Sequence, residues 1–167
     1  MYEEKFEKAF GYMIENEGGY VFDKNDPGGE TKFGISKKSY PHLNIKALTL
    51  EDAKKIYYED YWIKGKIDQI QSEIIAAQLL DLTVNLGIRA ATIILQRALR
   101  SASIYVSEDG LMGPVTISAV SNSEPNILLA AMKSEAAGYY RLITSKNPRL
   151  KKFLQGWLNR AYRKIIL

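Results

Sequence analysis

The sequence contains no cysteine and only one histidine, His42, among its 167 residues. Disulfides and thiolate metal sites are therefore excluded, and a single imidazole cannot build a histidine-based metal site. A Ser-His-Asp triad would have to use His42, which lies in a predicted loop without a nucleophile-elbow motif beside it. Carboxylates could still bind calcium, but the turn-forming residues 107–110 lack the alternating acidic ligands of a calcium loop, and we expect no metal and no cofactor.

Long hydrophobic runs are also lacking. The longest apolar run, Ile127 to Met132, is far too short to span a bilayer. The N-terminal residues Met1 to Lys5 are too acidic and too polar for a signal peptide. We expect synthesis in the cytoplasm without a signal peptide, so that a target in the wall or periplasm would require assisted export or lysis.

Neither charge sign dominates, since 23 basic residues stand against 19 acidic residues and give a net charge of +4. A modest positive excess suits either nucleic acid or an anionic polymer such as a bacterial cell wall. The basic residues are dispersed and accompany no recognition motif, so we do not expect nucleic-acid binding. The length suits one domain, or two small lobes that share a core.

Helical spacing of apolar residues predicts a mainly α-helical fold. The first helix is expected from about Tyr2 to Glu17, before the glycine pair at 18–19. A small β-hairpin or irregular ribbon around the turn-forming residues 26–29 should follow it. Further helices are expected from Thr49, where a capping box begins, to about Tyr61, from Ser72 to Gly87, from about Arg89 to Ser101, from Pro114, from Pro125 to about Thr144, and after Pro148.

Glu17 occupies an unusual position in the first predicted helix. On a helical wheel with Phe6 at the origin, Glu17 falls at about 20°, inside the apolar stripe, whereas Glu15 falls at about 180°. Burial and the negative end of the helix dipole both favour the protonated acid. Glycosidic bond cleavage requires such a proton-holding acid. A structural glutamate that bonds to the following ribbon is an equal alternative.

Two polar residues of the predicted ribbon extend this candidate site. Asp26 and Thr31 follow Glu17 by nine and fourteen residues, so a hairpin would bring them across a cleft from the helix end. Asp26 would stabilise an oxocarbenium ion or activate water, and Thr31 would orient that water. Asp26 also begins an Asp-Pro-Gly-Gly sequence, and we favour simple turn chemistry for Asp26 when it is considered alone.

The motifs along the chain resemble, in order, those of glycoside hydrolase family 108, a lysozyme-like family of phage-type endolysins and secretion activator proteins. The second half resembles the predicted peptidoglycan-binding module that usually follows. The chain departs from the family pattern at Glu30 and Lys32, which affects fine substrate contacts and not the chemistry. The motifs that carry the resemblance are Glu17-Gly18-Gly19-Tyr20, Asp26-Pro27-Gly28-Gly29 with Thr31, Gly34-Ile35, Tyr61-Trp62, Asp81 with Val84-Asn85 and Gly87, Leu95-Gln96 with Ala98-Leu99, Asp109-Gly110 with Gly113-Pro114 and Thr116, and Phe153 with Gly156-Trp157 and Arg160.

The resemblance implies a lysozyme-like fold and hydrolysis of the β-1,4 bond between N-acetylmuramic acid and N-acetylglucosamine in peptidoglycan, with Glu17 as the catalytic acid. It divides the chain into a catalytic lobe at 1–90 and a peptidoglycan-binding lobe at 91–167, packed as one unit. Peptidoglycan glycan strands are the expected partner, a holin-like membrane protein is the expected aid to export, and a monomer is expected. The alternative is a non-catalytic wall-binding or secretion-assisting protein of the same fold, against which the intact Glu17 stands.

The residues expected to bind the glycan are mostly aromatic. Sugar contact and core packing both remain open for these aromatic side chains, and Asn85 can bond either a sugar amide or its own helix end. Asp81, on the same predicted helix, faces either the cleft or, as we favour, a basic structural partner. The expected binding set is Tyr20, Tyr61, Trp62, Asn85 and Trp157.

Overall fold

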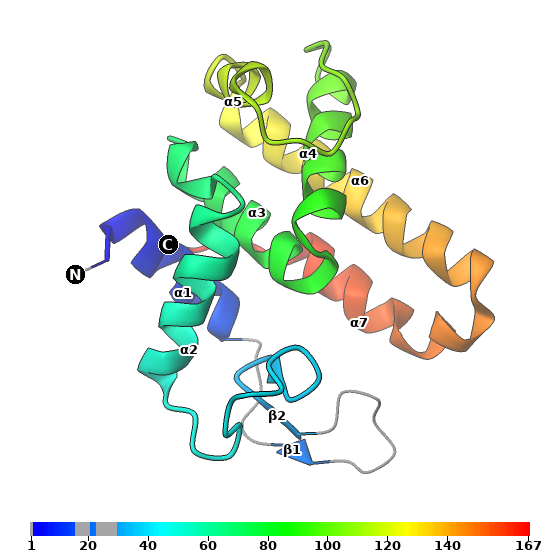
Figure 1. Cartoon of the computed structure of the whole chain (residues 1–167). Helices are drawn as coiled ribbons and strands as arrows, with labels where there is room; N and C mark the ends of the chain where they lie inside the picture. Colours follow the sequence, from blue (N-terminus) through cyan, green and yellow to red (C-terminus); the bar gives the residue numbers. More distant parts are fainter. Residues whose placement is uncertain (1, 16–20, 23–29) are drawn as a thin grey trace.

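The structure is a computed structural model that describes residues 2–15, 21–22 and 30–167, and these residues are mainly α-helical (Figure 1). This architecture confirms the predicted mainly α, lysozyme-like fold with a small sheet after the first helix. None of the described helices has the length and apolar character needed to cross a membrane. The described elements are α1 (Glu4–Ile14), β1 (Val21–Phe22), β2 (Glu30–Lys32), β3 (Ile35–Ser36), α2 (Leu50–Tyr57), the π-helical turn η1 (Tyr58–Ile63), the 3-10 turn η2 (Ile67–Gln69), α3 (Glu73–Leu86), α4 (Ile88–Ser101), α5 (Pro114–Ser121), α6 (Pro125–Lys146), the 3-10 turn η3 (Pro148–Leu150) and α7 (Lys151–Tyr162).

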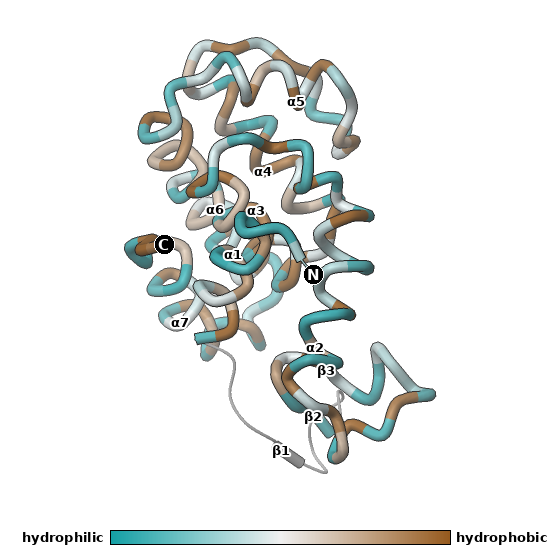
Figure 2. Tube along the Cα trace, turned by 90° about the vertical axis from the view of Figure 1, so that its left-hand side faces the viewer, coloured by the Kyte–Doolittle hydropathy of each residue, from teal (hydrophilic) through white to brown (hydrophobic). Residues whose placement is uncertain are grey.

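The sheet is small and antiparallel, with strand order β1-β2-β3. Thr31 in the middle strand lies opposite Val21 on one side and Ser36 on the other. The sequence predicted a two-stranded hairpin, and the structure adds β3 because Phe33 and Gly34 both adopt positive φ angles and close a tight turn. In both views the sheet lies at one end of the molecule and α5 at the other (Figures 1 and 2).

The apolar face of α1 is buried as the periodicity predicts. Phe6, Phe10 and Met13 are all buried, whereas Glu15, which caps the end of the helix, is exposed. The helix begins at Glu4 and not at Tyr2, whose ring packs 5.3 Å from the ring of Phe6. The wheel is therefore correct for the described part of this helix, but α1 ends at Ile14 and not at about Glu17 as predicted. Residues 16–20 lie outside the described residues.

The capping box at the start of α2 is formed as predicted. The Thr49 hydroxyl accepts a hydrogen bond from the Asp52 backbone N–H, and the Asp52 carboxylate accepts from the Thr49 backbone N–H. After Tyr57 the helix widens into the π-helical turn η1, which the sequence did not indicate. This turn carries Trp62 into the core, where the indole N–H donates to Glu3 Oε1 at 2.6 Å.

Helix α3 is the centre of the fold, and its buried residues run without interruption from Ile75 to Thr83. It packs against α1, α4 and α6, and α6 in turn packs against α4 and α7. Gly87, at a φ of 85°, ends α3 and begins α4. Figure 2 shows hydrophobic and hydrophilic residues alternating along the helices, the pattern expected when each helix buries one side.

Candidate functional site

A pocket of about 440 Å³ lies between the C-terminal end of α3 and one face of α7. Its polar lining consists of amide and guanidinium side chains, and its one aromatic residue is an indole. We call it the α3–α7 pocket. Its lining residues are Asn85, Gly156, Trp157, Asn159, Arg160 and Arg163.

A buried ion pair fixes the position of one pocket arginine. The Arg160 guanidinium donates from Nε to both oxygens of Asp81, at 3.1 and 3.0 Å, and its Nη2 lies 2.9 Å from Asp81 Oδ1. The Asp81 side chain is only 2% exposed, so this bidentate contact is shielded from water. The pairing gives Asp81 the structural, cation-binding role that we favoured from the sequence. It also joins α3 to α7 across the two predicted lobes.

A second arginine connects the pocket to α1. Arg163 donates from Nη2 to the backbone carbonyl of Tyr12, and its guanidinium lies 3.7 Å from the centre of the Tyr12 ring. Burial raises the pKa of the Tyr12 phenol, which keeps this ring neutral beside the cation. Because Tyr12 lies in the last turn of α1, the α3–α7 pocket adjoins the end of the helix that Glu17 follows in the sequence.

Two of the residues expected to bind a glycan meet in this pocket. Asn85 donates from Nδ2 to the Tyr140 hydroxyl at 2.5 Å, and the Tyr140 ring stacks on Trp157 with 5.3 Å between centroids. Phe153 stacks on Trp157 as well, at 5.7 Å. Burial raises the pKa of Tyr140, so its hydroxyl stays protonated and available for hydrogen bonding. The pair Asn85 and Trp157 is thus held firmly at the pocket wall.

The other expected site residues lie elsewhere. Thr31 is half-buried in β2, and Tyr61 is half-buried with its ring 5.4 Å from that of Tyr57. Trp62 is completely buried in the core, so the expectation that it contacts a sugar is wrong and its packing alternative holds. Glu17, Tyr20 and Asp26 lie outside the described residues.

Two tyrosines attach the segment that follows β2 to the helices. The Tyr57 hydroxyl donates to the backbone carbonyl of Phe33 at 2.7 Å, and the Tyr40 hydroxyl donates to Asp60 Oδ2 at 2.9 Å. Burial raises the pKa of Tyr40, whereas the hydrogen bond from Lys64 lowers the pKa of Asp60. These contacts fix the β2–β3 turn relative to α2 and η1, and with it the strand that carries Thr31.

Sequence reasoning missed Asn159 and Arg163 as pocket residues and gave Gly156 no role of its own. A usable signal was present, because Gly156, Asn159, Arg160 and Arg163 recur at the spacing of one helical face. Three of the residues at these positions are polar and one is glycine, whereas a helix face that packs on the core would carry apolar residues. The periodicity shows that these residues share a face, but not which element lies opposite.

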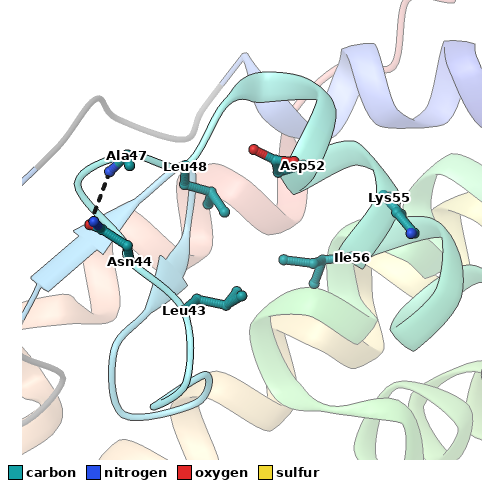
Figure 3. Close-up of a pocket in the computed structure, with 7 residues that line it drawn as sticks. All are labelled: Leu43, Asn44, Ala47, Leu48, Asp52, Lys55 and Ile56. Atoms are coloured by element: carbon teal, nitrogen blue, oxygen red, sulfur yellow. Dashed lines mark hydrogen bonds between the residues drawn. The ribbon is translucent and has the colours of Figure 1, made fainter.

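Another pocket, of about 350 Å³, lies between α2 and the segment that precedes it (Figure 3). Two of its polar side chains already have local partners, since Asp52 belongs to the capping box and Asn44 Oδ1 accepts from the Ala47 N–H at 3.3 Å. The remaining lining is mostly apolar. Among the described residues, no group of three or more His, Asp or Glu side chains is arranged to hold a metal ion. The α3–α7 pocket is therefore the stronger candidate for binding a polar ligand.

The described residues form a mainly helical protein with a small antiparallel sheet and a polar pocket between α3 and α7. A family model described as glycosyl hydrolase 108 matches residues 10–87, and a model described as predicted peptidoglycan domain matches residues 90–162. Residues 10–87 therefore belong to the glycosyl hydrolase 108 family, and residues 90–162 belong to the predicted peptidoglycan domain family. Both matches confirm the resemblance that the motifs indicate. They support, at the level of the family, a glycoside hydrolase or related secretion activator with peptidoglycan as its partner.

A similar solved structure is that of SagA from Brucella abortus, with a TM-score of 0.68. The two sequences are 24% identical, and the match covers 96% of this chain and 98% of that chain. At this identity the likeness shows a common fold. A comparison with curated proteins gives no significant match.

Proposed function

We propose that the protein is an N-acetylmuramidase that hydrolyses the β-1,4 bond between N-acetylmuramic acid and N-acetylglucosamine. The observation that carries this proposal is the position of the α3–α7 pocket. Through Arg163 and Tyr12 it adjoins the last turn of α1, the helix that Glu17 follows in the sequence. Glycosidic bond cleavage needs a substrate site beside the acid, and the proposal assigns Glu17 to that place from its position in the sequence alone.

In this proposal Glu17 acts as the general acid and protonates the oxygen of the leaving sugar. Asp26 is the second carboxylate, which stabilises positive charge at the anomeric carbon or activates water. Thr31 orients that water from the middle strand of the sheet. Asn85 and Trp157 contribute to binding of the glycan from the pocket, and Tyr61 and Tyr20 remain proposed contacts on the sheet side.

The experiment that tests the proposal is digestion of purified peptidoglycan followed by mass analysis of the fragments. A muramidase releases muropeptides whose reducing end is N-acetylmuramic acid, and the turbidity of the wall suspension falls. Fragments that end in reducing N-acetylglucosamine, or cleavage only within the peptide stems, would contradict the proposed bond specificity. An unchanged wall with a folded protein would favour the non-catalytic alternative.

We also propose that a holin-like membrane protein assists export, as the family resemblance implies. Expression of this chain alone in a Gram-negative host should leave the protein in the cytoplasm of intact cells. Co-expression with a holin should release it to the wall and lyse the cells. Spontaneous appearance of the protein in the periplasm of intact cells would contradict the need for a partner.

A further inference from the structure

The last part of the chain carries charge of one sign only. Basic residues occur along the whole chain, but the last acidic residue is Glu135. Residues 136–167 contain eight basic side chains and no acidic side chain, whereas the residues before them hold the other 15 basic and all 19 acidic side chains. The modest net charge of +4 therefore combines a negative first part with a strongly basic C-terminal part. Such an imbalance indicates attraction to an anionic partner.

Four of these cations lie close together where α6 ends and α7 begins. Lys146 is the last residue of α6, Arg149 lies in η3, and Lys151 and Lys152 begin α7. All four residues are exposed, and among the residues that the structure describes none of them has an acidic partner. Figure 1 shows this connection, in orange, at the outer edge of the molecule. We call residues 146–153 the α6–α7 tip.

The lysines of the tip do not serve the stability of α7. The N-terminal end of a helix carries a partial positive charge, which favours acidic and disfavours basic side chains there. The first turns of α1 and α2 contain acidic residues and follow this rule. Helix α7 instead begins with Lys151 and Lys152, has no acidic residue in its first turn, and has an N-cap residue, Leu150, that makes no side-chain hydrogen bond. These cations therefore need an explanation outside the folding of the helix.

An exposed aromatic ring lies within the same tip. Phe153 is 46% exposed, and Lys152 Nζ lies 4.8 Å from the centre of its ring. The ring also stacks on Trp157, with 5.7 Å between centroids, which holds it in place at the surface. Cations beside an exposed aromatic ring suit the interface of a membrane, where the cations meet lipid phosphates and the ring enters the region below the headgroups. A soluble polyanion would use the cations but would not need the apolar ring.

We propose that the α6–α7 tip docks the protein on a membrane surface that contains anionic phospholipids. Arg149, Lys151 and Lys152 lie at the lipid phosphates, and Phe153 lies at the boundary with the acyl chains. Neither of the two pockets described above is lined by a residue of the tip, so lipid docking and glycan binding use different residues. The docking is peripheral and largely electrostatic, so it weakens as the salt concentration rises. It does not depend on the proposed hydrolysis.

The test measures co-sedimentation of the full chain with lipid vesicles. One set of vesicles contains phosphatidylglycerol mixed with phosphatidylcholine, and the other contains phosphatidylcholine alone. A triple variant removes three cations of the tip, and a control variant of the same net charge removes three exposed lysines elsewhere in the chain. The tip variant carries Arg149→Gln, Lys151→Gln and Lys152→Gln, and the control variant carries Lys38→Gln, Lys46→Gln and Lys66→Gln.

We expect the wild-type protein to bind the vesicles with phosphatidylglycerol and to bind phosphatidylcholine alone much more weakly. Each lysine or arginine near an anionic lipid surface strengthens binding by about fivefold, so the tip variant should lose roughly a hundredfold in affinity. The control variant should keep most of its affinity. The tip variant should not melt below the wild-type protein, because cations are removed from the positive end of α7.

The aromatic part of the tip is tested separately. Phe153→Ala should lower the affinity for the vesicles with phosphatidylglycerol by about fivefold, since the ring no longer adds apolar surface at the lipid interface. Leu111→Ala is the control, because Leu111 is 63% exposed and lies outside the tip. This control should bind the vesicles as the wild-type protein does.

Several results would overturn the proposal. Equal losses of vesicle affinity in the two triple variants would show that net charge attracts the protein, and not the tip. Unchanged vesicle binding in Phe153→Ala, with equally tight binding of the wild-type protein to double-stranded DNA, would assign the tip to a soluble polyanion. A lower melting temperature of the tip variant would show that its cations serve the fold.

Digestion of purified walls separates this proposal from the proposed function. The tip variant should digest walls at the wild-type rate, because its changes lie outside the α3–α7 pocket. A loss of wall digestion as large as the loss of vesicle binding would assign the cations to the wall and contradict lipid docking. A wild-type protein that binds the vesicles through the tip but fails to digest walls would reject the muramidase and support the docking surface.

Discussion

At the residue scale, the contact between Asp81 and Arg160 is a polar interaction that joins the two halves of the chain. The two residues are 79 positions apart, and both oxygens of the nearly inaccessible carboxylate accept from the guanidinium. Such a pair does not guarantee stability compared with an apolar pair of the same size. Removing Asp81 alone is costly, because the guanidinium of Arg160 then loses this bidentate contact in a poorly solvated place.

We therefore expect Asp81→Ala to lower the free energy of unfolding by about 3 kcal/mol, measured by denaturant titration. Glu108→Ala is the matched control, since Glu108 pairs with Arg97 at 2.9 Å but both side chains are exposed by a third or more. That change should cost less than about 1 kcal/mol. An equal decrease in the free energy of unfolding in the two variants would contradict the proposed importance of the Asp81 pair for stability.

The second carboxylate of the proposed reaction has its own test. Asp26→Asn should lower the rate of wall lysis by less than the roughly 10²–10⁴-fold associated with a general acid, while thermal unfolding stays unchanged. The reason is that Asp26 is expected to assist the reaction and does not carry the proton. Asp23→Asn serves as the control and should lyse walls at the wild-type rate. A larger loss in Asp23→Asn than in Asp26→Asn would transfer the role to Asp23.

Some of these residues were predictable from the sequence, and others were not. The side-chain amide of Asn85, which can bond a sugar amide, and the aromatic ring of Trp157 indicated that both could bind a glycan, and both line the pocket. Trp62 has the same chemistry but lies in the core, because the π-helical turn η1 directs it inward. The type of a residue indicates what its side chain can bind. Whether that side chain reaches the surface depends on tertiary packing, which the local sequence does not determine.

At the scale of secondary-structure elements, the start of α2 depends on one reciprocal contact. Thr49 and Asp52 each bond the other's backbone N–H, and their side chains bond directly at 2.6 Å. The hydrogen bond from the Thr49 hydroxyl lowers the pKa of Asp52, and the Thr49 backbone N–H lowers it further. A carboxyl group with a lowered pKa in the folded state stabilises the protein above its unfolded pKa, and this contribution is lost as the pH falls through the folded pKa.

We expect Thr49→Ala to destabilise the protein near neutral pH by about 1 kcal/mol, the usual value for loss of an N-cap side chain. The pKa of Asp52, followed by carboxyl NMR titration, should rise toward its ordinary value in this variant. The stability difference between the two proteins should therefore shrink in acid, below the ordinary range for aspartate. If the difference in stability between the two proteins stays constant down to the lowest pH, the Thr49 side chain does not lower the pKa of Asp52 as we expect.

Helix positions followed closely from the sequence because capping and periodicity are local. The capping box at Thr49, the stop at Gly87 and the start at Pro114 all lie where the residues place them. The π-helical turn η1 and the strand β3 did not follow. Both are accompanied by tertiary contacts, namely the bond from Trp62 to Glu3 beside η1 and the bond from Tyr57 to the carbonyl of Phe33 beside β3. Local propensity is a weak guide where such contacts decide the backbone.

At the scale of the whole molecule, helices of the C-terminal half pack against helices of the N-terminal half. Helix α6 packs on α3 and α4, and α7 completes the α3–α7 pocket with Trp157, Arg160 and Arg163. Lys133 of α6 also donates to the backbone carbonyl of Arg163 at 2.7 Å. The substrate site proposed for the glycosyl hydrolase half therefore needs residues from the peptidoglycan domain half.

Truncation after Ser107 should consequently remove both cooperative unfolding and wall lysis. The shortened chain would lose α6, which packs against α3 and α4, and these two helices carry many buried apolar residues, among them Leu95 and Leu99. Circular dichroism, thermal unfolding and the turbidity assay would measure the loss. A fragment that stays folded, with unchanged melting and activity, would show that the C-terminal half is a separable module.

The central claim is that Glu17 supplies the proton that cleaves the glycan. The most direct measurement compares lysis of purified walls by Glu17→Gln and Glu15→Gln at equal concentrations of folded protein. Glutamine keeps the shape and hydrogen-bonding capacity of glutamate but cannot release a proton. Glu17→Gln should lose roughly 10²–10⁴-fold in rate without unfolding, and Glu15→Gln, exposed at the end of α1, should keep its activity. Lysis by Glu17→Gln at a rate near that of the wild type would contradict the proposed mechanism.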